Sequence, residues 1–306
     1  MSFAKKVYEA LPMPIKNLAI SALGNMNKRK RYGKYYNEYL AFLRESQWWP
    51  YEKLVEYQKK RLKELLLEVY EYVPYYRRIL EELGLRANDI QNCNDTLEIL
   101  KKMPYLEKQT LRDSLPDLIN TNPKRKTVGT IHTSGTTGTP LNIPSDIESV
   151  QFSFAIWRRF HDWMGLPEKF KQVRFSGRII IDPKRGKPPF WVYNAPSKQL
   201  FMSTYHMNDT NLASYVEKLN EFQPDLIDGY PSAIFILSQF IVKNNSKLAF
   251  SPKAIATTAE TLYVHQRETI QEAFKCKVYD QYASSEGAPF IAQCEYSNYH
   301  MNFDTG

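Results

Sequence analysis

The sequence contains little cysteine and no long apolar run. Its three cysteines, Cys93, Cys276 and Cys294, are widely spaced and form no C-x-x-C pair. This spacing argues against a disulfide framework and a structural zinc site, and it is typical of a reducing compartment. No run of about eighteen apolar residues occurs, so we expect no transmembrane helix. The first residues lack an apolar core followed by a small-residue cleavage site, so we expect no secretory signal and a cytoplasmic protein.

Acidic residues are scarce at the start of the chain. Residues 1–34 hold eight Lys and Arg but one Glu, which is +7 of a formal net charge of +8. Lys28–Arg31 is the densest cluster, and the apolar residues before it are spaced as on an amphipathic helix. Such a segment favours peripheral contact with an anionic membrane at its inner face, but a solvated face or a partner-docking arm explains it equally well. No recognition module surrounds it, so we expect no nucleic-acid partner.

The apolar spacing changes near residue 125. Before it, the pattern predicts helices over 36–47, 51–72, 77–85, 96–102 and 108–118. After it, the pattern predicts strands over 127–132, 173–181, 225–228, 253–257 and 277–281, and helices over 146–164, 212–221, 233–243 and 263–274. Residues 182–203 carry four prolines and are predicted to run over the surface. We therefore expect a helical region over 1–125 packed on an α/β core over 126–306, with a mixed sheet flanked by helices.

The segment 132–141, with the sequence HTSGTTGTPL, combines two glycines with five hydroxyl residues. Glycine lets backbone N–H groups turn toward a bound anion, and each hydroxyl adds a donor, which suits a polyphosphate. The segment is not a Walker loop, because the lysine of that motif is missing. A metal or a distant basic residue would have to balance the phosphates. An ordinary Ser/Thr/Gly turn explains the composition equally well.

Two downstream segments give this loop a context. Residues 254–262 read AIATTAETL, and residues 278–287 read VYDQYASSEG. Together with the loop, they resemble the adenylate-forming ligases, which include acyl-CoA synthetases, peptide-synthetase adenylation domains and luciferases. The likeness is closest to the phenylacetate–CoA ligase branch, with its CapK-like and coenzyme F390 synthetase-like members. It extends through 73–77 (VPYYR), 106–112 (LEKQTLR), 188–191 (PPFW), 229–232 (GYPS) and 266–282.

The resemblance implies the large N-terminal domain of a ligase that uses ATP and Mg²⁺. Such a ligase activates a carboxylic acid as an acyl-adenylate and transfers it to CoA or an amine, for CapK-like members in capsular or cell-surface polysaccharide biosynthesis. The implied phosphate-binding residues are Thr133, Ser134, Gly135, Thr136, Thr137, Gly138 and Thr139. The implied adenine pocket contains Ala259, Glu260, Thr261, Asp280, Gln281, Tyr282 and Ser284.

The remaining implied roles concern catalysis and the substrate. Ser285 would reach the α-phosphate and Glu286 would hold Mg²⁺, so that these two and Thr136 are the catalytic candidates. Tyr230, Pro231 and Ser232 would approach the carboxylate substrate.

Each of these residues also has a simpler interpretation. Glu286 could be an ordinary exposed acid, and Glu260 could be an acid stabilised by a helix N-terminus. Tyr282 could be a core aromatic residue. The segment 229–232 could be a turn in which Ser232 caps the next helix.

Three features depart from the family pattern. Leu141 stands where the superfamily usually has lysine, and Ala283 replaces the usual glycine of the Tyr-Gly-x-[ST]-Glu segment. A positive φ at Ala283 would cost roughly 1 kcal/mol. The family's ribose-binding aspartate, C-terminal lysine and small C-terminal domain are not found before Gly306. The alternatives to a ligase are therefore a nucleotide- or acyl-adenylate-binding module without turnover and a membrane-associated scaffold of glycan assembly.

Overall fold

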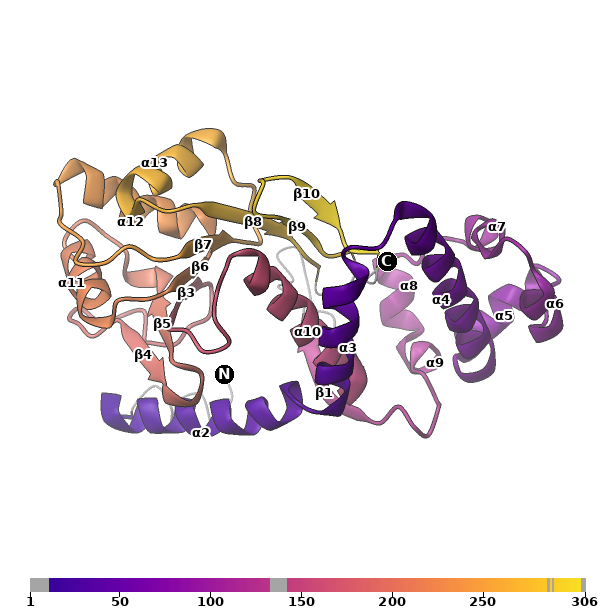
Figure 1. The fold of residues 1–306 in the computed structure, drawn as a ribbon. Coiled ribbons are helices and arrows are strands. Elements are labelled where there is room, and N and C mark those ends of the chain that lie inside the picture. Colours follow the sequence, from indigo (N-terminus) through magenta and orange to yellow (C-terminus); the bar gives the residue numbers. More distant parts are fainter. Residues whose placement is uncertain (1–10, 133–141, 285–286, 288, 304–306) are drawn as a thin grey trace. The chain divides into compact units, whose positions relative to one another are not determined.

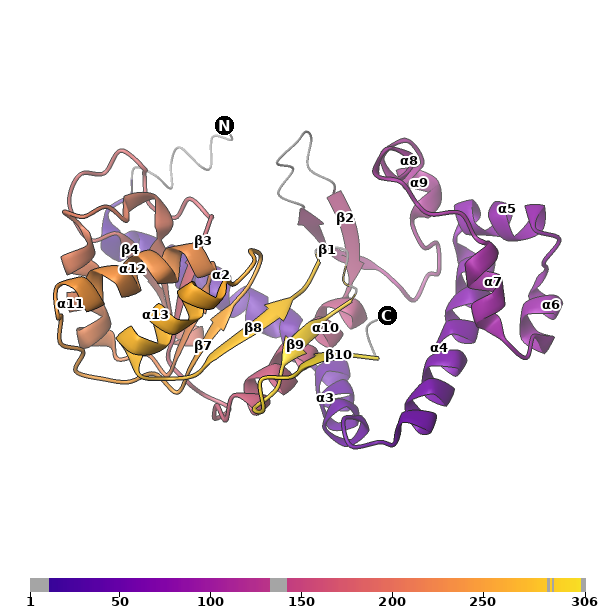
Figure 2. The same cartoon turned by 90° about the horizontal axis from the view of Figure 1, so that it is seen from above.

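The computed structural model describes residues 11–132, 142–284, 287 and 289–303. These residues form a mixed α/β structure with helices α2–α13 and strands β1–β10 (Figures 1 and 2). The predicted fold class is confirmed. The chain divides into two compact units, one of residues 33–156 and the other of residues 1–32 with 157–306. The domain boundary predicted between residues 125 and 126 stays a prediction. No helix in the described ranges combines the length and apolar character needed to cross a membrane.

The unit of residues 33–156 is mainly helical. Its helices are α3 (Lys34–Ser46), α4 (Tyr51–Tyr72), α5 (Pro74–Glu82), α6 (Ala87–Asn92), α7 (Thr96–Lys102), α8 (Lys108–Asp113), α9 (Leu115–Leu118) and the first part of α10 (Ile147–Trp163). The helix predicted over 51–72 is confirmed; it ends at the residue before Val73-Pro74, because proline disfavours helix in the residue that precedes it. Its small core contains Leu66, Leu80, Ile90 and Ile99.

A two-stranded hairpin in this unit carries the segment of residues 133–141. Strand β1 (Thr127–His132) was predicted, whereas its antiparallel partner β2 (Asn142–Asp146) was not. Arg125 links the hairpin to α4 by ion pairs. Its guanidinium pairs with Glu68 on α4 and lies 3.0 Å from the carboxylate of Asp146 on β2. Asp146 in turn accepts a hydrogen bond from the backbone N–H of Ser149, at 2.7 Å.

The second unit contains an eight-stranded sheet of order β10-β9-β8-β7-β6-β3-β5-β4. Its strands are β3 (Gln172–Ser176), β4 (Trp191–Asn194), β5 (Gln199–Ser203), β6 (Leu226–Gly229), β7 (Ala254–Thr257), β8 (Val278–Tyr282), β9 (Ile291–Gln293) and β10 (Tyr299–Met301). The five central strands are parallel, and antiparallel strands lie at both edges. The carboxyl ends of β6, β7 and β8 therefore meet at one rim of the sheet.

Helices α11 (Leu212–Phe222), α12 (Pro231–Lys243) and α13 (Val264–Phe274) cover one face of the sheet (Figure 1). The strands present aliphatic and aromatic residues to them, including Val173, Phe175, Ile227, Ile255 and Val278, all fully buried. We call this the helix-covered face. It holds the main core of the unit, because successive residues of a strand alternate between the two faces.

The opposite face carries polar residues among its apolar ones: Gln172, Arg174, Ser176, Asp228 and Gln281. We call it the polar face. The second half of α10 lies on this side of the sheet (Figure 1), where Trp157 packs edge-on against Phe290 with ring centroids 5.4 Å apart.

Helix α2 (Met13–Arg31) packs against the edge strand β4 through polar and small residues. Asn17 accepts a hydrogen bond from the backbone N–H of Tyr193 at 2.9 Å, and Ser21 accepts one from Ala195 at 3.1 Å. At Gly24, an added Cβ would lie 2.1 Å from Asn194 Oδ1. A larger residue at this point would therefore require the Asn194 side chain to move.

Two sequence predictions for this unit are wrong. The strand predicted over 173–181 ends at Ser176. The surface excursion predicted over 182–203 contains β4 and β5, which are joined by a short 3₁₀ helix, Ala195–Ser197. A second 3₁₀ helix, Thr204–His206, follows β5. The four prolines fall outside both strands, which is why they permit strand pairing.

Candidate functional site

Three of the predicted site segments follow adjacent strands at one rim of the sheet. Residues 229–232 lie at the end of β6, residues 257–261 at the end of β7 and residues 280–284 at the end of β8. The first two are joined by a hydrogen bond from the backbone N–H of Thr258 to the carbonyl of Gly229, at 3.1 Å. The carboxyl rim of parallel strands is where open α/β sheets bind ligands, so this rim is the candidate site.

Gly229 makes the sharp end of β6. Its φ is +150°, and an added Cβ would lie 2.1 Å from the carbonyl oxygen of Phe175 on β3. Side chains are therefore excluded here by backbone conformation and by contact. The chain turns so that the N–H of Tyr230 reaches the same carbonyl, and α12 begins at Pro231. Ser232 lies inside the helix and does not cap it; the predicted capping role of Ser232 is wrong.

Glu260 reaches across to this helix. Its carboxylate accepts a hydrogen bond from the backbone N–H of Ser232, at 3.1 Å, in the first turn of α12. An anion is stabilised by the free N–H groups and the dipole of a helix N-terminus. The helix-terminus interpretation of Glu260 is thus the one that the contacts favour, with the helix being α12. The contact also holds the segments after β6 and β7 together.

Asp280 is hydrogen-bonded to residues on strands β7, β9 and β10. Its Oδ1 accepts a hydrogen bond from the Thr257 hydroxyl at 2.5 Å, and its Oδ2 accepts one from the Tyr299 hydroxyl at 2.7 Å. The backbone N–H of Asp280 donates to Gln293 Oε1 at 3.0 Å. Burial and the hydrogen bond to Asp280 raise the pKa of Tyr299 to about 12, so this phenol remains a donor at neutral pH.

The three residues Asp280, Gln281 and Tyr282 do not line one wall. Asp280 and Tyr282 project on the helix-covered side of β8, and Gln281 projects on the polar face. Tyr282 is 59% exposed, which excludes the core interpretation of this side chain. Gln281 is buried, and both its side-chain oxygen and its side-chain nitrogen have no partner among the described residues.

The backbone dihedral angles of these segments show whether Ala283 requires a positive φ. Ala283 does not adopt a positive φ, so its methyl group adds no strain there. Ala259 does, with φ of +67°, and Gly287 has φ of +96°. Ala259, Glu260 and Thr261 are all exposed at the rim, as residues that contact a ligand would be.

The remaining predicted residues lie outside the described part of the chain. These are Thr133, Ser134, Gly135, Thr136, Thr137, Gly138, Thr139, Ser285 and Glu286. Their predicted roles in phosphate and Mg²⁺ binding stay predictions. Within the described ranges, no group of three or more His, Cys, Asp and Glu residues is arranged to hold a metal ion, and the three cysteines are free thiols.

Sequence reasoning missed Asp228, which lies one residue before the 229–232 segment. It is buried on the polar face, and its Oδ2 lies 3.4 Å from Arg174 Nη1. Burial raises the pKa of Asp228, against the opposing effects of Arg174 and of a hydrogen bond from Gln172. Its Oδ1 has no partner among the described residues. A carboxylate inside the short apolar run Leu226-Ile227-Asp228-Gly229 was the available signal.

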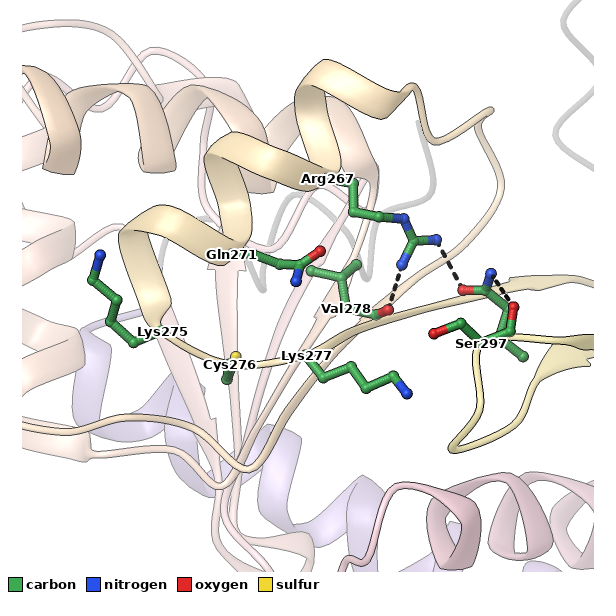
Figure 3. Close-up of a pocket in the computed structure, with 8 residues that line it drawn as sticks. Arg267, Gln271, Lys275, Cys276, Lys277, Val278 and Ser297 are labelled. Carbon is green, nitrogen blue, oxygen red and sulfur yellow. Dashed lines mark hydrogen bonds between the residues drawn. The ribbon is translucent and has the colours of Figure 1, made fainter.

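This unit also contains a pocket that is separate from the rim site (Figure 3). It lies where β8 begins, at the opposite end of the strand from Tyr282, and it is lined by Arg267, Lys275, Cys276 and Lys277 among others. Arg267 donates to the carbonyl of Val278 at 2.5 Å, and Lys277 donates to a backbone carbonyl. Two of these cations, Arg267 and Lys277, already donate to backbone carbonyls, and the pocket lies away from the rim site.

Comparison with known proteins places the chain among ligases. No family model matches the chain. Protein CapK of Staphylococcus aureus is 34% identical over 300 residues, which cover 98% of this chain and 64% of CapK. Phenylacetate-coenzyme A ligase of Escherichia coli (strain K12) is 37% identical over 184 residues, which cover 59% of this chain and 39% of the ligase.

A solved structure supports the same fold. 2-Hydroxyisobutyryl-CoA ligase, in complex with 2-HIB-AMP and CoA, matches with a TM-score of 0.58 at 20% identity, over 82% of this chain and 54% of that chain. This likeness shows the fold alone. The chain thus spans less than two thirds of the length of these relatives. The chain is thus similar in sequence to CapK and to phenylacetate-coenzyme A ligase, and its fold is that of an adenylate-forming ligase domain.

Proposed function

We propose that the full-length protein activates a carboxylic acid with ATP and transfers the acyl group to the thiol of CoA. The observation that carries the proposal is the meeting of three site segments at the carboxyl rim of β6, β7 and β8 in a chain of this family. The relatives named as CoA ligases and the neighbour bound to 2-HIB-AMP and CoA support it. An amine acceptor, and a role in capsular polysaccharide assembly, are proposals that rest on the resemblance of the sequence to CapK-like members of the family.

In the proposed reaction, a carboxylate oxygen attacks the α-phosphorus of ATP, and pyrophosphate leaves. The CoA thiolate then attacks the acyl carbon, and AMP leaves. The first step builds negative charge on phosphate oxygens, so the protein contributes positioning and charge neutralisation. Mg²⁺, when bound, would neutralise part of this charge.

The loop 133–139 would provide donors to the β- and γ-phosphates, Ser285 would contact the α-phosphate and Glu286 would hold the metal. Exposed Tyr282 would stack on adenine, beside Ala259 and Thr261. Tyr230, Pro231 and Ser232 would approach the carboxylate substrate.

The test is ATP–pyrophosphate exchange by the full-length protein, beside calorimetric titration with ATP and Mg²⁺. We expect acid-dependent exchange and saturable heat, and we expect Glu286→Gln to weaken both by about tenfold or more, since a carboxylate ligand to the metal is lost. Glu268→Gln is the matched control, because Glu268 is an exposed acid on α13.

Nucleotide binding without exchange in the presence of any acid would leave a binding module and contradict the ligase. Equal losses in both variants would remove the metal role of Glu286.

We also propose that α2 lies on an anionic membrane surface. The side of α2 that faces away from β4 is apolar, with exposed side chains at Ile15 (46%), Leu18 (69%), Leu23 (52%) and Met26 (63%). The last turn of the helix is basic over Lys28–Arg31. An outward apolar side next to a cationic cluster matches what an interfacial helix needs: burial among acyl chains and attraction to anionic headgroups.

Liposome co-sedimentation of the full-length protein tests this second proposal. We expect binding to vesicles with phosphatidylserine, weaker binding to neutral vesicles, and loss of binding in 0.5 M salt to about the neutral level, because exposed charges are screened. Leu18→Glu should abolish binding. Leu65→Glu, at a leucine of α4 that is 55% exposed, should not. Binding that is indifferent to lipid charge and to both variants would contradict the proposal.

A further inference from the structure

Three buried polar atoms on the polar face of β6 and β8 have no partner among the described residues: Asp228 Oδ1, Gln281 Oε1 and Gln281 Nε2. Both side chains are more than nine-tenths buried, with 3% exposure each. Leaving one such atom without a hydrogen bond costs about 1–3 kcal/mol. Native proteins keep such groups where a ligand or an ordered water completes them.

The register places these atoms on one face of the sheet, two strands apart. Asp228 on β6 is paired with Ala256 on β7, and Ala256 is paired with Tyr279 on β8, two residues before Gln281. With strands about 4.8 Å apart and a rise of about 3.3 Å per residue, the Cα atoms of Asp228 and Gln281 are on the order of 12 Å apart. Between them stands Ala256, whose side chain is a single methyl group. A ligand group that reached both polar side chains would therefore contain only a few non-hydrogen atoms.

The two side chains also adjoin both halves of the candidate site. Asp228 lies two residues before Tyr230, which is proposed to approach the acid, and Gln281 lies next to Tyr282, which is proposed to stack on adenine. A molecule whose carboxylate reacts at this rim would place the remainder of its chain close to both.

We infer that the acid activated by this protein carries its own hydrogen-bond donor, a hydroxyl or an amino group, which binds between Asp228 and Gln281. Asp228 Oδ1 can only accept while the carboxyl is ionised, so it requires a donor from the ligand. The amide of Gln281 donates and accepts, so it satisfies a hydroxyl or amino group from the other side. Arg174 balances the Asp228 charge through Oδ2 and leaves Oδ1 for the ligand. The inference rests on the proposed acid activation and specifies its substrate class.

Matched acids test this inference with the full-length protein. The pairs are propionate with lactate, propionate with β-alanine, and phenylacetate with 4-hydroxyphenylacetate, each compared by kcat/KM for ATP–pyrophosphate exchange. A site that is built to hydrogen-bond a substrate group rejects the analogue lacking that group by up to about 10⁴-fold. We expect a preference of at least about 100-fold for a donor-bearing acid in one pair or more.

Variants then locate the preference. Asp228→Ala and Gln281→Ala should each reduce the preference to below about tenfold, mainly through KM, with smaller effects on the apolar acids. Asp228→Asn should affect an amino acid substrate more than a hydroxy acid, because the amide oxygen still accepts a hydrogen bond but no longer carries charge. Asp225→Asn, at the other end of the same strand, is the control and should retain the full preference.

The outcomes separate the inference from the function on which it rests. Exchange with apolar acids at equal or greater kcat/KM, or a preference that survives Asp228→Ala, overturns the inference and leaves the ligase in place; ordered water then completes the three atoms. Exchange with none of the acids counts against the ligase itself. A thermal melt of each variant shows that it is folded before its kinetics are compared.

Discussion

The two faces of the eight-stranded sheet differ in how far their polar side chains are hydrogen-bonded. On the helix-covered face, polar side chains occur at the rim, and there both oxygens of Asp280 are bonded, to Thr257 and Tyr299. On the polar face, Asp228 and Gln281 lie deeper and keep atoms without partners among the described residues. The first arrangement stabilises the fold, whereas the second is costly to the fold unless something else binds. The difference separates Asp280, which is bonded within the fold, from Asp228 and Gln281, for which we propose a ligand.

The largest loss of stability is expected for a substitution at Gly229, where the helix-covered face ends. Gly229→Ala forces a Cβ to within 2.1 Å of the Phe175 carbonyl at a φ of +150°. The backbone of β3 or β6 must move, so we expect a loss of about 4 kcal/mol or more in the free energy of unfolding. Urea denaturation measures it. Gly186→Ala, at a glycine with open space around it, is the control and should stay within about 1 kcal/mol of wild type.

A core substitution on the helix-covered face should have the next largest effect. Ile255→Ala removes a fully buried side chain from the main core. We expect a loss of about 3 kcal/mol, from the lost burial and the cavity that remains. Exchange activity per folded molecule should be nearly unchanged, because the side chain points away from the polar face. A large fall in activity of the folded variant would show that the two faces are not independent.

Asp228→Asn tests the polar face. Unlike the two preceding substitutions, it should increase the free energy of unfolding. The pKa of Asp228 is raised by burial, so the folded state binds the proton more tightly than the unfolded state does. The contribution of Asp228 to stability is then greatest below about pH 4, the ordinary Asp pKa, and is lost as the pH rises through the raised value. The uncharged Asn avoids this loss.

We therefore expect Asp228→Asn to be about 1 kcal/mol more stable than wild type at pH 7, with the advantage shrinking toward pH 4. Thermal melts across this range measure it. A variant that is less stable at pH 7 would mean that the pair with Arg174 contributes more than the burial of the carboxylate costs.

Much of this architecture could be predicted from the sequence, and the limits have physical causes. The helices over 51–72 and 263–274 and the strands over 127–132, 253–257 and 277–281 follow from apolar spacing and proline boundaries, and they are confirmed within a residue or so. Strands β9 and β10 have three residues each, too few to show a period, and β4 and β5 are separated by a tight turn that the prolines obscured.

The three segments of the candidate site could be predicted from the sequence. The way their side chains are arranged and bonded could not. Strand alternation alone could have separated Asp280 from Gln281, because neighbours on a strand face opposite sides. The cap that Glu260 provides to α12 could not have been read, because it joins residues 28 apart through a side chain. Nor does any pattern show that one oxygen of Asp228 has no partner within the described part of the chain, since that depends on every residue packed around it.

The smallest expected effect lies at the rim, where the two faces meet. Tyr299→Phe removes one hydrogen bond to Asp280 from a residue that is itself 53% exposed. Water can replace the lost donor, so we expect a loss of less than about 1 kcal/mol in unfolding free energy and a change in the KM for ATP of about threefold or less. Thr257→Val removes the other hydrogen bond, which is buried, and should cost more, because no water can take the place of that donor. If the exposed tyrosine mattered more than the buried threonine, Asp280 would need Tyr299 for its position in the site, and the bonded carboxylate of the helix-covered face would belong to the ligand-binding machinery as much as Asp228 does.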